Sequence, residues 1–378
     1  MLGNLLNPTA EREVQPQQQD QSLKGKPRRQ RSLIMQYAKL SGVGLLAFLV
    51  AVSLLGHIIP SPPIPSNIVF IGPKYDYYQA HKDDYTVLFF GSSRIYSQVI
   101  PEVFDATAQA AGGEVNSYNF GIPAMRAIDS MVLLEQVLAD PPENLKWVFF
   151  ESVLDKGYEP FPNARTPRAM YWHTWKNTGL AARYILSSDE SWLNKAVLLS
   201  SHLLPFVYHQ INVGRLFYQV LPSDLSAQDQ AIAADFTATE GYFALTDEAD
   251  PFRQEFLQNP QGYQQELTTL ATMQARSVSD EPYLSANKQM LLKRIVKAVQ
   301  VAGAEPIFVE PPSLHMEDDF RAAQQLSTID ILLSYKDPHQ YPQLYRSDQR
   351  HDAEHLNDAG ARTFTQLLAK DFSAAVTP

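Results

Sequence analysis

The sequence predicts an α/β fold in which a parallel sheet is flanked by helices, and three observations support this prediction. Apolar runs rich in β-branched and aromatic residues alternate with helical periodicity between residues 85 and 155. The same alternation resumes near residue 284 and continues to residue 372. Between them, residues 156–280 hold three of the four tryptophans and predict a mainly helical insertion. Strands that alternate with helices at this spacing pair in parallel, through right-handed crossovers.

The first predicted strand, Thr86–Phe90, ends at a turn that carries two serines. Charged residues precede the run and Gly91 stops it, so we expect a strand that is buried on both faces. Ligands of open α/β sheets bind beyond the carboxyl ends of the strands, where Ser92 and Ser93 lie. A serine there is suited to be a nucleophile, and the alternative role is to cap the helix that follows.

Two more strands follow, each after a helix. In chain order we expect a helix over 99–111, a strand over 115–120, a helix over 125–138 and a strand over 147–150. Gly112 and Gly113 end the first helix, and prolines follow the second. Gly121 and Glu151 come directly after the two strands, so they belong to the same edge of the sheet as the serines.

The C-terminal part contributes one more strand and two helices. Ser285 can cap the first of these helices and Gly303 ends it. The strand Pro306–Val309 comes next, and the last helix places Phe364 and Phe372 on one apolar stripe. We expect all of these elements and the insertion to form one domain, residues 85–378.

Asp352 and His355 stand just ahead of the last helix, which Asn357 can cap. A carboxylate three residues before an imidazole can orient the ring within one turn, as the aspartate does in a Ser-His-Asp triad. His351 and His355 also have the i, i+4 spacing of a zinc pair on a helix. Because the helix is predicted to start after His355, we expect neither a metal site nor a cofactor.

Three short blocks together resemble the SGNH/GDSL hydrolase superfamily: Gly91-Ser92-Ser93, Asn119-Phe120-Gly121 and Asp352-Ala353-Glu354-His355. The resemblance implies a three-layer, flavodoxin-like fold. It also implies that Ser93 is the nucleophile, that His355 is the base, and that Asp352 orients the base. The Gly121 amide would bind the oxyanion. Asn119 belongs to the second block and Ser92 to the first, so both are candidates for oxyanion or substrate binding. Ser92 is also the reserve nucleophile, or a helix cap. Apart from the resemblance, Arg94 either holds an anionic substrate group or forms a surface salt bridge.

Glu151 stands where the family has an asparagine that completes the oxyanion hole. A carboxylate repels an oxyanion, so either Glu151 faces elsewhere or another group supplies the donor. A Gly-Ser-Ser block together with the lost asparagine resembles branches of the family that work outside the membrane. These are the cell-envelope polysaccharide O-acetylation proteins and the D-alanine transfer protein of teichoic acid synthesis.

The resemblance implies an enzyme that transfers an acyl group to a cell-envelope or exported polysaccharide, or that hydrolyses its esters. The partner it implies is a multi-pass membrane acyltransferase that supplies the acyl donor. Two alternatives remain open. One is a plain esterase or lipase, and the other is a catalytically degenerate subunit that binds polysaccharide or supports its assembly or export.

The first 84 residues predict a membrane anchor. Residues 40–60 carry no formal charge and are long enough for one helix across a bilayer core of about 30 Å. Residues 24–39 hold six basic residues and no acidic one, so the positive-inside rule places residues 1–39 in the cytoplasm, as a disordered tail. The Pro-rich residues 61–84 predict an extended linker. The domain that follows is expected on the periplasmic or extracytoplasmic side of an inner or plasma membrane.

Charge divides the chain at the same place. Residues 1–60 hold seven of the 31 Lys and Arg residues and three of the 41 Asp and Glu residues, which leaves 24 against 38 for the remainder, a net charge of −14. So acidic a domain argues against nucleic acid as a partner. The chain has no cysteine, which excludes thiol nucleophiles and disulfides.

Overall fold

The computed structural model describes residues 35–37, 39–48, 50, 51, 54, 64–66, 68–160, 163, 164, 166–211, 234, 236–276, 282–315 and 318–376. The chain divides into two compact units, Met1–Leu55 and Gly56–Pro378. All elements of the predicted α/β domain lie in the second unit.

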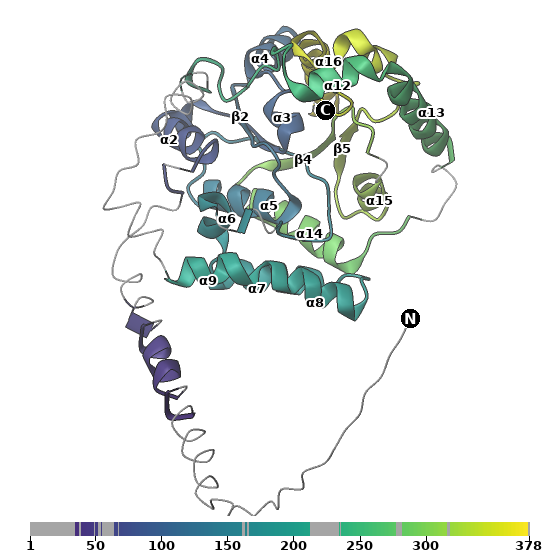
Figure 1. The fold of residues 1–378 in the computed structure, drawn as a ribbon. Helices are drawn as coiled ribbons and strands as arrows, with labels where there is room; N and C mark the ends of the chain where they lie inside the picture. The colour runs from purple at the N-terminus through teal and green to yellow at the C-terminus, as the bar shows by residue number, and fades with distance from the viewer. Residues whose placement is uncertain are drawn as a thin grey trace, which may run out of the picture. The chain divides into compact units, whose positions relative to one another are not determined.

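The second unit is built on a five-stranded parallel sheet of order β2-β1-β3-β4-β5 (Figure 1). The strands are β1 (Val87–Gly91), β2 (Ser117–Gly121), β3 (Trp147–Phe150), β4 (Glu305–Glu310) and β5 (Ile331–Ser334). In β1, Phe90 pairs with Phe120 of β2 and Phe150 of β3. The parallel sheet with helices on both faces confirms the predicted α/β class and its three layers.

Alternate residues of β1 face opposite layers of helices. Val87 and Phe89 pack into one apolar cluster, and Leu88 and Phe90 into the other. Helices α4 (Pro101–Ala110), α12 (Pro251–Gln258), α13 (Pro260–Arg276) and α16 (Asp358–Val376) contribute to the first cluster. Helices α2 (Ile71–His81), α5 (Ala127–Val137), α7 (Trp175–Leu186), α14 (Ala286–Val301) and α15 (Asp319–Gln325) contribute to the second. Both faces are covered, which is why the strands carry apolar residues at successive positions.

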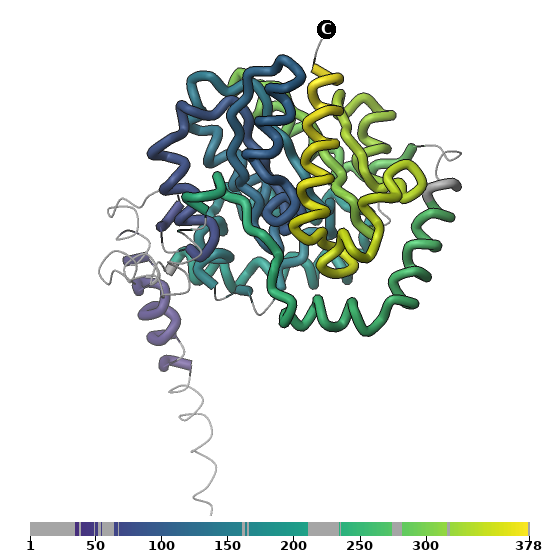
Figure 2. The backbone as a smooth tube through the Cα atoms, turned by 90° about the horizontal axis from the view of Figure 1, so that it is seen from above, coloured from purple at the N-terminus to yellow at the C-terminus, as the bar shows by residue number. Residues whose placement is uncertain are grey.

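The insertion is helical, as predicted. In the described part of the insertion, the helices are α6 (Pro167–Trp172), α7, α8 (Trp192–Ser201), α9 (Leu203–Ile211), α12 and α13. Figure 2 shows α12 and α13, in green, arching around the rim of the unit beside the yellow C-terminal helix. The insertion therefore covers both layers: α7 packs beside α14, whereas α12 and α13 join the layer of α16.

Shorter elements connect these helices and strands. They are α3 (Ser93–Tyr96) and the 3₁₀ turns η2 (Lys82–Asp84), η5 (Pro342–Tyr345) and η6 (Ser347–Gln349). The prediction of an extended linker over 61–84 is wrong for its described residues. Ile64, Ile68 and Tyr78 are buried in the core, and Pro73 is tolerated because it lies in the first turn of α2.

In the first unit, all described positions, 35–37, 39–48, 50, 51 and 54, are helical. Residues 1–34, which form most of the predicted tail, and residues 55–60 of the predicted span lie outside the described part of the chain. Among the residues that are described, no helix has both the length and the apolar character needed to cross a bilayer.

Candidate active site

A sharp turn between β1 and α3 positions the two serines. β1 ends at Gly91, where a Cβ atom would lie 2.4 Å from the Ile95 side chain, so only glycine lets the helix start this close to the strand. The Ser92 hydroxyl accepts a hydrogen bond of 3.3 Å from the Arg94 amide and thereby caps α3. Ser93 occupies the first position of the helix.

Ser93, His355 and Asp352 form a continuous hydrogen-bonded chain. His355 Nε2 lies 2.8 Å from Ser93 Oγ, across 262 residues of sequence. On the other side of the ring, His355 Nδ1 lies 2.8 Å from Asp352 Oδ2 and 3.0 Å from Oδ1. Asp352 Oδ1 also accepts hydrogen bonds from the amides of Glu354, at 2.7 Å, and His355, at 2.8 Å. The arrangement is that of a nucleophile, a base and the carboxylate that orients the base.

The hydrogen bonds to Asp352 favour the ionised form of its carboxyl group. Burial acts to raise the pKa of Asp352, but the hydrogen bond and charge of His355, with the two amides, outweigh it and hold the pKa below its ordinary value. Asp352 is therefore ionised at neutral pH. It keeps the proton on Nδ1, so that Nε2 can accept the proton of Ser93.

Arg350 holds the loop that carries Asp352 and His355. Its side chain is fully buried, and Nη1 donates to the Pro312 carbonyl at 3.2 Å. Nη2 donates to the Ala353 carbonyl inside the loop. This role of Arg350 was not predicted, because nothing in the sequence distinguishes a buried arginine from an exposed one.

The start of α16 closes the same loop. The Gly360 amide donates to Asn357 Oδ1 at 3.0 Å, so Asn357 caps the helix as predicted. A Cβ atom at Gly360 would lie 2.1 Å from the Gln349 carbonyl oxygen, so the helix approaches the preceding chain too closely for a larger residue.

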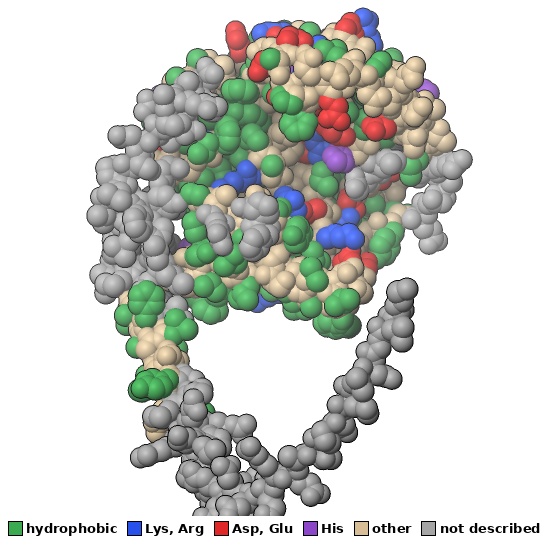
Figure 3. Space-filling model, in the orientation of Figure 1, with side chains coloured by type: hydrophobic (Ala, Val, Ile, Leu, Met, Phe, Trp, Pro, Cys, Tyr) green, Lys and Arg blue, Asp and Glu red, His purple; other side chains and the backbone are tan. Residues whose placement is uncertain are grey.

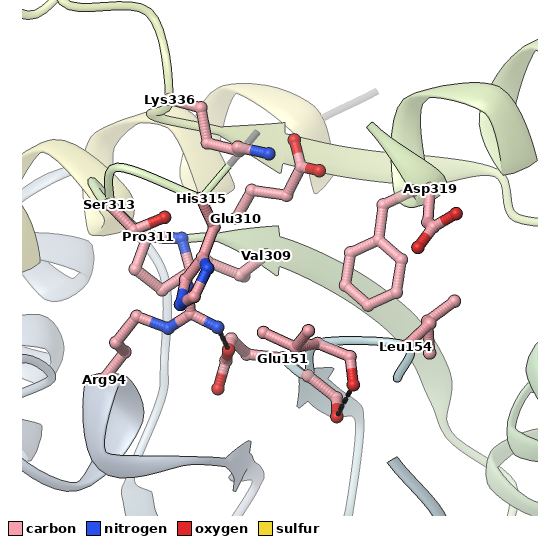
Figure 4. A pocket seen from close by; sticks show the side chains of 13 residues that line it. Arg94, Glu151, Leu154, Val309, Glu310, Pro311, Ser313, His315, Asp319 and Lys336 are labelled. Atoms are coloured by element: carbon pink, nitrogen blue, oxygen red, sulfur yellow. Dashed lines mark hydrogen bonds and ion pairs between the residues drawn. The ribbon is translucent and has the colours of Figure 1, made fainter. Parts of the chain in front are cut away.

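Glu151 lies beneath the serine turn, with 1% of its surface exposed. Its Oε2 accepts a hydrogen bond of 2.7 Å from the Ser92 amide, and its Oε1 forms an ion pair of 2.6 Å with Arg94 Nη2. The carboxylate is therefore neutralised and bound to the backbone of the turn. Figure 4 shows this pair, with the Arg94 side chain reaching across to Glu151.

Asn119 and Gly121 have structural roles in this geometry. Asn119 is fully buried, and its Nδ2 donates to the carbonyls of Ile95, at 2.8 Å, and Val99, at 2.7 Å. Its Oδ1 accepts from the Gly121 amide at 2.7 Å. This contact corrects the expectation that the Gly121 amide is an oxyanion donor, because its hydrogen is already engaged by Asn119. Both residues instead fix α3 on the end of β2.

Lys74 of α2, which was not predicted as a site residue, supports the same strand end. Its side chain is fully buried, and Nζ donates to the carbonyls of Asn119, at 2.9 Å, and Gly121, at 2.7 Å. Burial lowers the pKa of Lys74 well below its ordinary value. Nζ also lies 4.7 Å from the centre of the Tyr96 ring of α3. Lys74 thus binds α2, the edge strand and α3 together.

Two pockets lie beside the segments that carry the triad. The first, of about 40 Å³, contains the Arg94–Glu151 pair and is lined by both charged and apolar side chains, among them His315, Lys336 and Phe320 (Figure 4). The second, of about 400 Å³, lies between α12, α13 and the 352–355 loop, and His355 and Asp352 form part of its wall. A molecule in the second pocket would contact the base directly.

The zinc alternative rested on His351 and His355. The ring of His351 is buried, and its Nε2 lies 3.8 Å from Asp250 Oδ1, whereas His355 is bound to Ser93 and Asp352. Among the described residues, no group of three or more His, Asp or Glu side chains is arranged to hold a metal ion.

Comparisons with known proteins assign no family to the chain. No protein-family model matches it, and no curated protein matches it significantly.

Proposed function

We propose that this protein is a serine-dependent O-acyltransferase or esterase of the SGNH type that acts on a cell-envelope or exported polysaccharide. The observation that carries the proposal is the hydrogen-bonded chain from Ser93 through His355 to Asp352. Two chain segments that are far apart in sequence, the serine turn and the loop 352–355, meet to form it. The parallel sheet and the position of Ser93 beyond β1 support the resemblance to the SGNH family.

In the proposed reaction, Ser93 Oγ attacks the carbonyl carbon of an acyl ester while His355 Nε2 takes its proton. Collapse of the tetrahedral intermediate breaks the bond to the donor alcohol, which leaves with the proton from Nε2. The acyl-Ser93 intermediate then reacts with a sugar hydroxyl or with water, which His355 deprotonates. The proton returns to Ser93 as the new ester or the free acid departs.

The Ser93 amide is the donor that we assign to the oxyanion. It lies in the first turn of α3, where backbone amides have no partner within the helix. The neighbouring amides of Ser92 and Arg94 are bound by Glu151 Oε2 and Ser92 Oγ. This leaves fewer donors than the family pattern, and acyl transfer would be correspondingly slow.

The reaction is proposed to take place outside the membrane. The support is the uncharged segment 40–60 and the six basic residues that precede it. Large apolar side chains in this segment, such as Leu45 and Leu46, are more than half exposed in the structure. On this topology, a multi-pass membrane acyltransferase would supply the acyl donor from the cytoplasm.

The proposal is tested by labelling the purified full-length chain with a fluorophosphonate and by assaying hydrolysis of an activated acetyl ester. Wild type is expected to be labelled and active, and Ser93→Ala and His355→Ala to lose both properties. Ser92→Ala is the matched control, because it removes the neighbouring hydroxyl and costs about 1 kcal/mol of stability as a lost cap. A wild-type chain that is neither labelled nor active would overturn the enzymatic proposal.

Two observations favour a second candidate, a non-catalytic subunit that binds polysaccharide or supports its assembly or export. Glu151 replaces the family asparagine, and the Gly121 amide is engaged by Asn119. A chain of this kind would bind a glycan without forming acyl-Ser93, and the labelling experiment separates the two candidates.

A further inference from the structure

We propose that the pocket between α12, α13 and His355 binds the acyl acceptor, and that this acceptor is a glycan without acidic groups. The role of the glycan as acyl acceptor rests on the proposed function, whereas binding of the glycan in the pocket does not. The pocket measures about 400 Å³, which lies within the range of small-molecule sites. We call it the acceptor pocket.

The insertion builds this pocket, and Arg253 fixes it beside the triad. Arg253 Nη1 donates to the Arg350 carbonyl at 2.9 Å, in the chain that leads into the 352–355 loop. Its Nε forms an ion pair of 3.0 Å with Glu248. At the start of α12, Asp250 caps the helix by accepting from the Phe252 amide at 2.7 Å. The insertion helix is therefore attached to the backbone that positions His355.

Aromatic side chains line the pocket. Phe252 and Phe256 are four residues apart on α12 and therefore share a face of the helix. Phe256 packs edge to face against Tyr263 of α13, with ring centres 5.1 Å apart, and both are buried. The Tyr263 hydroxyl is held by the Tyr345 carbonyl at 2.7 Å. Phe252, by contrast, is 68% exposed. An exposed ring at the mouth of a pocket offers a flat apolar face on which a sugar ring can stack.

The charge of the wall selects among glycans. Glu255, Glu266, Asp352 and Glu354 line the pocket, and none of its lining residues is a lysine or an arginine. Figure 3 shows acidic side chains, in red, gathered on the upper part of this face, where Figure 1 places α12. A polymer with a carboxylate on each sugar would bring like charges into contact with this wall. A neutral or amine-bearing glycan would meet hydrogen-bond acceptors that suit hydroxyl and ammonium groups.

The location of the pocket matches the second half of the reaction. An acceptor hydroxyl must lie within reach of His355 Nε2 to give up its proton while its oxygen attacks the acyl-Ser93 carbonyl. The new ester bond forms as the bond to Ser93 Oγ breaks, and the proton passes from His355 to Ser93. A glycan stacked on Phe252 would also displace water from the wall that contains His355, which favours transfer over hydrolysis.

The test measures binding without turnover. Ser93→Ala in the full-length chain is titrated with cellohexaose, a chitosan hexamer and hexagalacturonate, and binding is followed by calorimetry and saturation-transfer NMR. We expect the first two to bind at least tenfold more tightly than the acidic oligosaccharide, with the difference shrinking in high salt. Phe252→Ala should weaken both by fivefold or more. Glu255→Gln with Glu266→Gln should reduce the discrimination against hexagalacturonate.

Trp192→Ala is the matched control, because Trp192 is also a highly exposed aromatic residue but lies on α8, outside the pocket. It should leave all three affinities unchanged. Equal affinity for the acidic oligosaccharide, or unchanged binding in Phe252→Ala, would overturn the inference. If Ser93→Ala binds the glycans but fluorophosphonate does not label the wild-type chain, the pocket is retained and the proposed enzymatic function is removed, so the two failures are distinguishable.

Discussion

Neighbouring residues of the serine turn have different roles because their surroundings differ. Ser93 and His355 were predicted from the order of the motifs, and the structure brings their side chains to 2.8 Å. The role of Glu151 could not be predicted, because the role of a carboxylate depends on its partners. Only the fold shows that Arg94 and the Ser92 amide bind it. The same holds for Gly121, whose amide is engaged by a side chain two residues away.

The pair between Arg94 and Glu151 predicts a strong asymmetry between single and double variants. Glu151→Ala leaves a buried guanidinium and the Ser92 amide without their partner, which should cost about 3–5 kcal/mol of unfolding free energy. The double variant Arg94→Met, Glu151→Leu removes both charges and should cost only about 1–3 kcal/mol, mainly for the unpaired amide. Urea unfolding of the three chains measures the difference. A double variant that is less stable than the single one would contradict this account of the pair.

Replacing Asp352 is expected to lower the rate of catalysis while leaving the protein folded. In Asp352→Asn the side-chain amide can hold the wrong tautomer of His355, so kcat for ester hydrolysis should fall by roughly 10³–10⁴. Asp348→Asn is the control, because this aspartate is exposed and pairs with Arg346 rather than with the triad. Its kcat should match wild type. Equal rates for the two variants would show that Asp352 does not orient the base.

We expect the contribution of Glu159 to the free energy of unfolding to depend on pH. Burial, together with the charge of Asp129, raises the pKa of Glu159 to about 7, whereas in an unfolded chain it is about 4.3. The folded state therefore favours the protonated form, and stability is lost as pH rises from about 4 to about 7. Relative to wild type, Glu159→Gln should gain nothing at pH 4 and up to about 3 kcal/mol at pH 8. Urea unfolding across this range checks the trend, which a constant difference between the two chains would refute.

Among the elements, strands that are buried on both faces were the most predictable. β3 coincides with its predicted span, and β1 and β2 are displaced by one or two residues. The short edge strand β5 and helix α15 were not predicted, because four half-buried residues carry little periodic signal. α2 was missed because the prolines up to Pro73 suggested a spacer, whereas in the structure Ile71 and Tyr78 of this helix are buried in the core. The acceptor pocket was also beyond prediction, because it joins α12 to a loop about 100 residues away.

The burial of α2 predicts that the domain does not begin at Tyr85. A chain truncated to start there would lose the buried Ile68, Ile71 and Tyr78 and the contacts of Lys74 with β2. At about 2 kcal/mol for each apolar side chain, the loss is comparable to the whole stability of an ordinary domain. We expect this chain to be insoluble or to lack cooperative thermal unfolding, whereas one that starts at Gly56 should unfold cooperatively. Equal melting temperatures for the two would refute a structural role for α2.

For the whole molecule, the division into Met1–Leu55 and Gly56–Pro378 predicts that the proposed membrane anchor and the proposed chemistry can be separated. The triad, both flanking pockets and the sheet all belong to the second unit, whereas most of the uncharged segment 40–60 and the basic residues before it belong to the first. A chain that starts at Gly56 should therefore keep fluorophosphonate labelling within twofold of the full-length chain. It should no longer float with lipid vesicles in a density gradient, because its net charge is strongly negative and it lacks most of the apolar segment. Flotation of the truncated chain would place the membrane contact in the second unit. If the full-length chain fails to float, the proposed anchor is wrong. The proposed chemistry at Ser93 would then be judged by fluorophosphonate labelling alone.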